Sequence, residues 1–122
     1  MAQWLSGTVT DNHHWHANLF SLKVKTAAFS FTAGQFVRLA LNTADGRLQR
    51  AYSLVNSPGS AEQEFLVSTV AEGKLSPLLQ QLKMGDVLDV SQPASGFFVL
   101  DEVPAGDNLW LMASGTGIGP YL

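Results

Sequence analysis

The chain has 122 residues, of which 46% are hydrophobic and 14% charged, a composition typical of one globular domain rather than of a disordered chain. A net charge of −3 argues against general nucleic-acid binding, and no apolar run reaches the length of a membrane span. The absence of cysteine excludes disulfides, cysteine-ligated zinc and cysteine-held iron–sulfur clusters. The N-terminus does not resemble a signal peptide, so we expect a cytoplasmic protein.

Five segments that alternate in polarity or are rich in branched and aromatic residues predict strands at 4–10, 18–25, 35–41, 50–53 and 64–70. Asp45-Gly46 predicts a hairpin between the third and fourth of these strands, and residues 29–34 predict a turn. His13, His14 and His16 lie in an expected loop at 11–16. We interpret this loop as solvated rather than as a metal site, because only Asp11 could complete the ligand set.

A helix is expected next, with Ser76 as its N-cap and Pro77 at its first position. It should end before Gly85, with an apolar stripe and a basic last turn at Leu78, Leu79, Leu82 and Lys83. The turn from Gly73 to Ser76 leads into the helix N-terminus, where free N–H groups and the charge of Lys74 predict an anion site. An ordinary capped helix is an equally good interpretation of the same residues.

Residues 87–90 predict a sixth strand, and 96–100 add an extended apolar piece. Six strands and one helix at this spacing predict a small closed barrel. The apolar run 108–113 is typical of a parallel strand covered on both faces, and the glycine-rich turn 114–120 follows it at once. We therefore infer a domain boundary near residue 105 and a chain that is the first part of a longer protein.

The fourth strand carries three side chains of different chemistry. Arg50 offers a planar fork of donors that suits phosphate, Tyr52 an aromatic face, and Ser53 a small hydroxyl. In a strand, Arg50 and Tyr52 point to one face and Ser53 to the other. All seven Lys and Arg lie in residues 1–83, so phosphate-binding side chains must come from there. Taken alone, the segment fits an ordinary half-buried strand better than it fits a nucleotide or flavin site.

Several motifs occur in a defined order, at 31–36, 49–53, 73–77, 96–100 and 115–122. Together they resemble the ferredoxin–NADP reductase family, in particular the bacterial ferredoxin/flavodoxin–NADP reductases. The resemblance implies a mainly β fold: a six-stranded antiparallel Greek-key barrel with one capping helix over residues 1–104. It also implies that residues 105–122 are the first strand and Gly-rich turn of an α/β NADP domain.

The resemblance further implies non-covalent binding of FAD. Arg50 would contact a phosphate, Tyr52 would pack against the flavin, and Ser53 would lie near its redox-active edge, the last two being the catalytic pair. The remaining cofactor contacts would be Ala51, Leu66, Val67, Thr69, Lys74, Leu75, Ser76 and Thr116. The NADP(H) substrate of the full-length protein would meet Gly115, Thr116 and Gly117.

The implied activity is electron transfer between NADPH and ferredoxin or flavodoxin, with a hydride exchanged at the flavin and single electrons passed to the carrier. We expect a monomer with no nucleic-acid, membrane or metal partner. One alternative is another enzyme on the same scaffold, a flavin reductase or an oxygenase-reductase component. The other is a non-catalytic barrel that acts as an interaction module.

Overall fold

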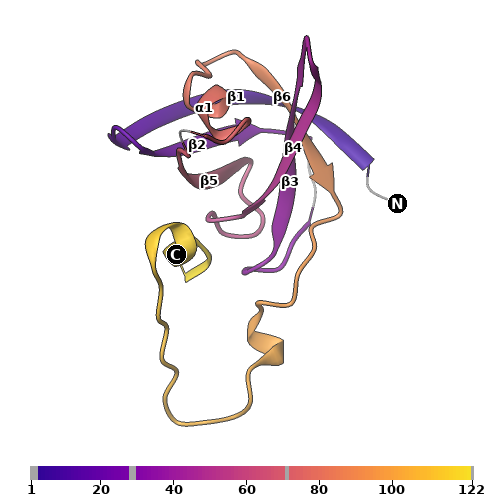
Figure 1. Ribbon diagram of the computed structural model, residues 1–122. Helices are drawn as coiled ribbons and strands as arrows, with labels where there is room; N and C mark the ends of the chain where they lie inside the picture. Colours follow the sequence, from indigo (N-terminus) through magenta and orange to yellow (C-terminus); the bar gives the residue numbers. More distant parts are fainter. Residues whose placement is uncertain (1–2, 28–29, 71, 122) are drawn as a thin grey trace.

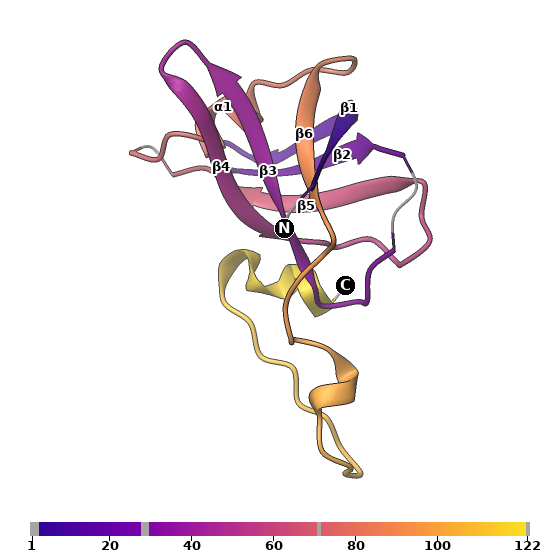
Figure 2. The same ribbon diagram turned by 90° about the vertical axis from the view of Figure 1, so that its right-hand side faces the viewer.

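The computed structural model describes residues 3–27, 30–70 and 72–121. Its framework is one antiparallel sheet with strand order β4-β3-β6-β1-β2-β5 (Figures 1 and 2). The strands are β1 (Gln3–His16), β2 (Leu19–Lys25), β3 (Phe36–Thr43), β4 (Gly46–Ser53), β5 (Glu62–Ser68) and β6 (Val87–Gln92). β6 returns to lie between β3 and β1, which is a Greek-key connection. The predicted six-stranded antiparallel fold is confirmed.

The segment that follows the edge strand β4 is hydrogen-bonded to the other edge strand, β5. Just after β4, the Val55 N–H donates to the Glu64 carbonyl of β5 at 3.0 Å. The Asn56 side-chain oxygen accepts the Glu64 N–H at 2.8 Å. Beyond this point β4 and β5 are not paired, so the sheet curls into a half-barrel that stays open between them (Figure 2).

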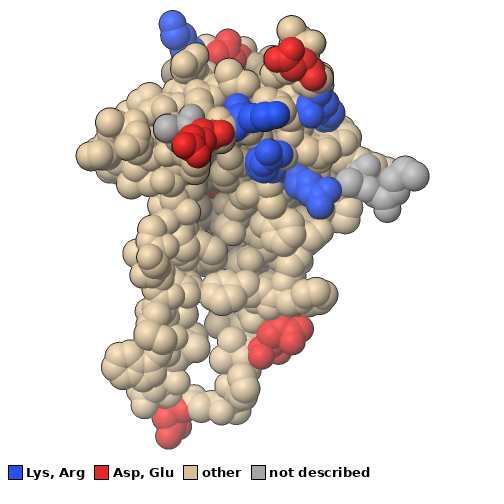
Figure 3. Space-filling model, viewed as in Figure 1, with Lys and Arg blue, Asp and Glu red and all other residues tan. Residues whose placement is uncertain are grey.

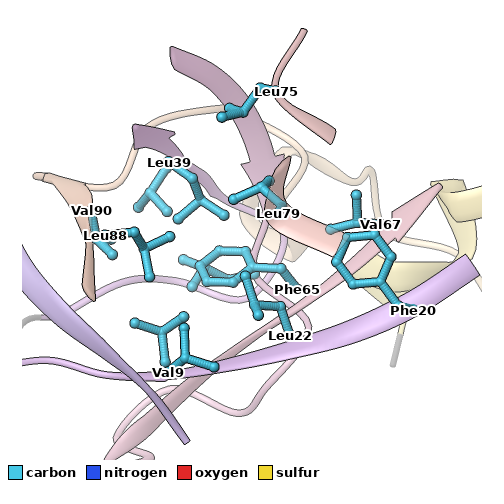
Figure 4. Packing of buried hydrophobic residues seen from close by; sticks show 13 residues of the cluster. Val9, Phe20, Leu22, Leu39, Phe65, Val67, Leu75, Leu79, Leu88 and Val90 are labelled. Carbon is cyan, nitrogen blue, oxygen red and sulfur yellow. The ribbon is translucent and has the colours of Figure 1, made fainter. Parts of the chain in front are cut away.

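The core fills the concave side of the sheet (Figure 4). Phe20, Leu39 and Phe65 come from three different strands and are fully buried. The helix α1 (Ser76–Gln80) closes one end of the core, where Leu75 and Leu79 point toward the strand side chains. Burial of these apolar side chains is the main favourable term that holds the curled sheet together.

The prediction of a loop at 11–16 was wrong, because β1 continues to His16. Its backbone pairs with β2 at His13–Ser21 and His14–Phe20. The His13 ring lies edge-on to Trp15 at 4.2 Å between centroids. The outer end of β1 is exposed and carries polar side chains, so the sequence there shows no alternation of apolar and polar residues that would indicate a strand. Of the turn predicted at 29–34, the Gln35 N–H to Thr32 carbonyl bond of 3.1 Å is described, and Phe29 lies outside the described residues.

The helix begins close to the predicted position but is shorter, ending at Gln80 instead of running to Gly85. Ser76 is not its N-cap: Leu75 holds that position and no side chain caps it. The Ser76 hydroxyl instead accepts the Val70 N–H at 3.0 Å. Gly85 belongs to the turn before β6, where it has φ +96°.

Residues 97–114 form a long loop that leaves the barrel and returns to it (Figure 1). The loop contains the short 3₁₀ helix η1 (Leu100–Glu102) and leads into a second one, η2 (Gly115–Tyr121). The strand predicted at 108–113 is absent: this segment is exposed, with Trp110 at 84% and Met112 at 81%. No strand among the described residues lies beside it, and a single strand without a pairing partner is not stable.

Candidate functional site

The candidate site is built on the inner face of the edge strand β4. Leu48 and Tyr52 of this strand pack against the core, and strand alternation places Arg50 between them on the same face. Arg50 lies opposite the fully buried Leu39 of β3 but is itself exposed, because the barrel is open at this edge. Ser53 is half-buried and occupies the other face, as the sequence predicted.

Tyr52 and Arg50 influence each other electrostatically. Burial raises the pKa of the Tyr52 hydroxyl above its ordinary value of 10.0, and the positive charge of Arg50 acts in the opposite direction. The Arg50 guanidinium donates to the Gln49 carbonyl at 2.7 Å. Arg47 and Asp89 form the one ion pair recorded among the described residues, at 2.9 Å. Arg50 therefore has no carboxylate partner there, and its charge is available to an anion.

The edge of β5 that faces the opening offers backbone groups. In an antiparallel ladder, alternate residues turn their N–H and C=O groups to opposite edges. The Glu64 carbonyl bonds toward β4 through Val55, while the Thr69 N–H bonds to the Asn18 carbonyl at the β2 side at 2.8 Å. By this alternation, Leu66 and Ser68 direct their backbone groups to the open edge.

Two predicted contact residues have side chains in the core: Val67 and Leu75 are each 1% exposed. Neither side chain is available to a cofactor, and the Val67 backbone faces β2 by the same alternation. The hydroxyl of Thr69 donates to Gln80 Oε1 at 3.1 Å, so it too is engaged within the protein. Lys74 is exposed on the loop before α1. Lys74 is therefore accessible to a ligand, whereas the side chains of Val67, Thr69 and Leu75 face the protein interior or bond within it.

The glycine-rich turn lies against the junction of β4 and β5. Gly119 of η2 is buried, and a Cβ added to it would lie 3.1 Å from Val55 Cγ2 and 4.0 Å from Leu66 Cβ. Thr116 is half-buried in the same helix. This packing brings Gly119 to the barrel edge next to Leu66, whereas Gly115 and Gly117, which were predicted to bind NADP, have no other atom within 4 Å of an added Cβ.

A separate apolar cavity of about 710 Å³ lies between the 97–114 loop, the segment after β4 and η2. Phe98 and Tyr121 border it, with their ring centroids 5.6 Å apart. Neither Arg50 nor Tyr52 lines this cavity, so it is distinct from the polar edge described above.

Charge is unevenly distributed over the surface. Arg38, Arg47 and Arg50 belong to β3 and β4, and Figure 3 shows basic side chains gathered over this hairpin. The 97–114 loop carries only acidic charges, three in number, at Asp101, Glu102 and Asp107. An anionic ligand is therefore favoured at the hairpin and disfavoured along the loop.

Sequence reasoning missed Asn12 and Gln80, whose side chains hold α1 in place. The Asn12 amide nitrogen lies 2.8 Å from the Leu82 carbonyl and also contacts the carbonyls of Leu79 and Gln80. Gln80 bonds to segments far away in the sequence. No local pattern marks such contacts, because they depend on how β1 and α1 pack.

The histidines of β1 do not gather around a common point. His16 Nδ1 accepts the Asn18 N–H at 3.4 Å, and the His14 ring lies 5.8 Å from that of Phe20. Among the residues that the structure describes, no group of three or more His, Cys, Asp or Glu side chains could hold a metal ion. No helix in the same part of the chain is long and apolar enough to cross a membrane.

Comparison with known proteins identifies the family. The chain is 53% identical over 122 residues to the flavodoxin/ferredoxin–NADP reductase of Escherichia coli K12, covering 100% of this chain and 49% of that protein. A ferredoxin NADP⁺ reductase from Neisseria gonorrhoeae, solved with bound FAD and NADP, matches with a TM-score of 0.92 and 26% identity, over 99% of this chain and 50% of that one. The Amycolatopsis cytochrome P450 reductase GcoB matches with a TM-score of 0.83 and 28% identity, over 98% of this chain and 37% of that one.

The chain spans about half the length of the curated relatives it matches. Residues 7–98, which cover all six strands from the middle of β1 onward, match the family model described as an oxidoreductase FAD-binding domain. The chain therefore belongs to the family of oxidoreductase FAD-binding domains.

Proposed function

We propose that this chain is the FAD-binding part of an oxidoreductase that transfers electrons between NADPH and ferredoxin or flavodoxin. The observation that carries the proposal is the pairing of Arg50 with Tyr52 on the open inner edge of β4, where Arg50 has no carboxylate partner among the described residues. The names of the relatives support this activity. The NADPH and carrier steps are proposed for the full-length protein, because the chain spans only about half of those relatives.

The residues present fit a non-covalently bound flavin dinucleotide. Arg50 supplies the forked donors that suit a phosphate, and Tyr52 supplies an aromatic face beside it. The backbone N–H and C=O groups of Leu66 and Ser68 face the same opening and suit the polar edge of a heteroaromatic ring. Ala51 lies between Arg50 and Tyr52 on β4.

The second phosphate contact would come from the loop before α1. Lys74 is exposed and supplies charge, whereas Leu75 and Ser76 would contribute backbone N–H groups, because their side chains are buried. Thr69 would border the cofactor from the end of β5, and Val67 would support the site from the core beneath it.

Residues 1–104 would form the FAD-binding domain, and residues 105–122 would begin the NADP-binding domain. The exposed apolar segment at Leu109–Met112 supports this division, because such side chains are normally covered by further protein. Gly115, Thr116 and Gly117 would then approach the nicotinamide nucleotide from η2.

Bound FAD supplies exchange of a hydride with a nicotinamide and of single electrons with a one-electron carrier. The protein's part is to bind, orient and shield. Tyr52 would hold the ring plane, and Ser53 would place a hydroxyl at the end of β4 to hold or move a proton. We expect Ser53→Ala to slow hydride transfer more than it weakens FAD binding, and equal losses would contradict this role.

The test is the visible absorption spectrum of the purified full-length protein, followed by release and chromatographic identification of the cofactor. We expect a flavin spectrum and FAD. Arg50→Met should weaken FAD binding by about ten-fold or more, the scale of one charge-assisted hydrogen bond. The control Arg38→Met changes an exposed arginine on the other face of the neighbouring strand and should leave FAD affinity unchanged. A colourless full-length protein that does not take up FAD would overturn the proposal.

The electron acceptor separates the proposed activity from that of a flavin reductase or an oxygenase-reductase component. NADPH oxidation should be fast with ferredoxin or flavodoxin and slow with free flavin. We also propose a cytoplasmic monomer, which size-exclusion chromatography with light scattering and cell fractionation would check. A higher rate with free flavin than with either carrier protein would favour the flavin reductase instead.

A further inference from the structure

The helix α1 depends on tertiary contacts for its position. It has only five residues, and a helix this short is not stable in isolation. Its last residue, Gln80, is half-buried and makes two hydrogen bonds outside the helix. Gln80 Nε2 donates to the Ala17 carbonyl at 2.6 Å, and Gln80 Oε1 accepts the Thr69 hydroxyl at 3.1 Å.

These bonds join three segments that are distant in the sequence. Ala17 lies in the turn between β1 and β2, Thr69 follows β5 directly, and Gln80 ends α1. The Thr69 N–H also bonds to the carbonyl of Asn18 in that turn, at 2.8 Å. The end of β5 is therefore attached to the turn twice, once directly and once through Gln80.

The first residue of α1, Ser76, is bonded to the segment that follows β5. The Val70 N–H donates to the Ser76 hydroxyl at 3.0 Å, and the Val70 carbonyl accepts the Gly73 N–H at 2.9 Å. These short-range bonds hold the first residues of α1 near Val70. At the far end of the helix, the Asn12 amide contacts backbone carbonyls of the helix and of the turn after it. Gln80 adds the bonds that fix this end to Thr69 and to the β1–β2 turn.

We propose that Gln80 is a positioning residue for the flavin dinucleotide: it sets the separation between the edge of β5 and the loop that carries Lys74 and Ser76. The inference rests on the proposed function, in which one ligand contacts both segments. A ligand that spans two segments binds only when both are correctly placed, and its apparent affinity falls with the fraction of molecules in that arrangement. Gln80 acts on the cofactor without touching it.

The test compares Gln80→Ala with Gln81→Ala in the full-length protein. Gln81 is the next residue, is exposed, and its side chain makes no hydrogen bond within the described part of the chain. FAD affinity is measured by reconstitution of the apoprotein, and the environment of the bound pyrophosphate by ³¹P NMR. We expect Gln80→Ala to weaken FAD binding about three- to ten-fold, the effect of losing one or two ordinary hydrogen bonds, and to shift the ³¹P resonances. Gln81→Ala should change neither.

A second pair of variants guards against general unfolding. Gln80→Glu keeps the acceptor for the Thr69 hydroxyl but turns a carboxylate oxygen toward the Ala17 carbonyl, so it should weaken FAD binding at least as much as Gln80→Ala. Thr69→Val combined with Gln80→Ala should weaken binding less than the sum of the single changes, because the two side chains share one bond. Unchanged FAD affinity in Gln80→Ala would overturn the inference.

Weaker FAD binding with unmoved ³¹P resonances, and with losses of affinity for Thr69→Val and Gln80→Ala that simply add in the double variant, would also overturn it, since that pattern indicates a loss of stability alone. Wild-type protein without FAD would instead overturn the proposed function and this inference with it.

Discussion

Replacing Gly34 with alanine is predicted to loosen the attachment of the 97–114 loop to the barrel. Gly34 is buried just before β3 and has φ +100°, a conformation that side chains rarely adopt. A Cβ built there would lie 1.7 Å from the carbonyl oxygen of Phe98. The clash is with backbone rather than with a flexible side chain, so the loop must move to admit the methyl group.

The magnitude follows from two contributions. The positive φ costs a residue with a Cβ about 1–2 kcal/mol. Displacing closely packed neighbours adds roughly 1–3 kcal/mol. Gly46 provides a matched control, because it has φ +120° with no atom within 4 Å of an added Cβ. Gly46→Ala should therefore show only the first contribution, and Gly34→Ala about 2–5 kcal/mol in total.

The assay is urea unfolding of both variants and of the wild type, followed by tryptophan fluorescence, with the slope checked for two-state behaviour. We expect a lower unfolding free energy for Gly34→Ala than for Gly46→Ala. Equal losses in the two variants would refute the argument, because they would show that the approach of the Phe98 backbone to Gly34 contributes nothing beyond the strained φ.

Three further changes test the core, the helix and the site. Phe65→Ala removes a fully buried ring and should cost about 3–5 kcal/mol of unfolding free energy, whereas Phe97→Ala, at a side chain 82% exposed, should cost little; chemical denaturation measures both. Asn12→Ala should lower the free energy of unfolding by about 1–2 kcal/mol, because α1 loses the bonds to its carbonyls. Asn12→Asp should lower it by more, because a carboxylate would face the carbonyls that the amide nitrogen now contacts. A higher melting temperature for Asn12→Asp than for Asn12→Ala would contradict this orientation of the amide. Burial raises the pKa of the Tyr52 hydroxyl above 10.0, so the contribution of this group to the free energy of unfolding is complete below pH 10 and is lost as pH rises through the folded-state pKa. Ultraviolet titration, with Tyr52→Phe as the reference, should show that Tyr52 ionises at a higher pH than an exposed tyrosine. Arg50→Met should move this ionisation to a still higher pH, because it removes the nearby positive charge.

The strands could be predicted from the sequence wherever alternation was clear. The hairpin at Asp45-Gly46 and the shared face of Arg50 and Tyr52 follow from turn chemistry and from the period of two, which are local properties. The role of Ser76 could not be predicted in the same way. Its hydroxyl has two possible uses, helix capping or bonding to a distant N–H, and only packing decides between them.

The position of the glycine-rich turn shows which contacts determine the local arrangement. The sequence predicted that a buried strand at 108–113 would present this turn, yet that segment is exposed and unpaired. η2 nevertheless packs closely on the barrel, because Gly119 has no side chain and Val55 and Leu66 lie directly against its backbone. The barrel edge therefore provides the contacts that hold η2, and the 97–114 loop is long enough to follow. The glycine at 119 is needed for this close packing, because a side chain there would press against Val55.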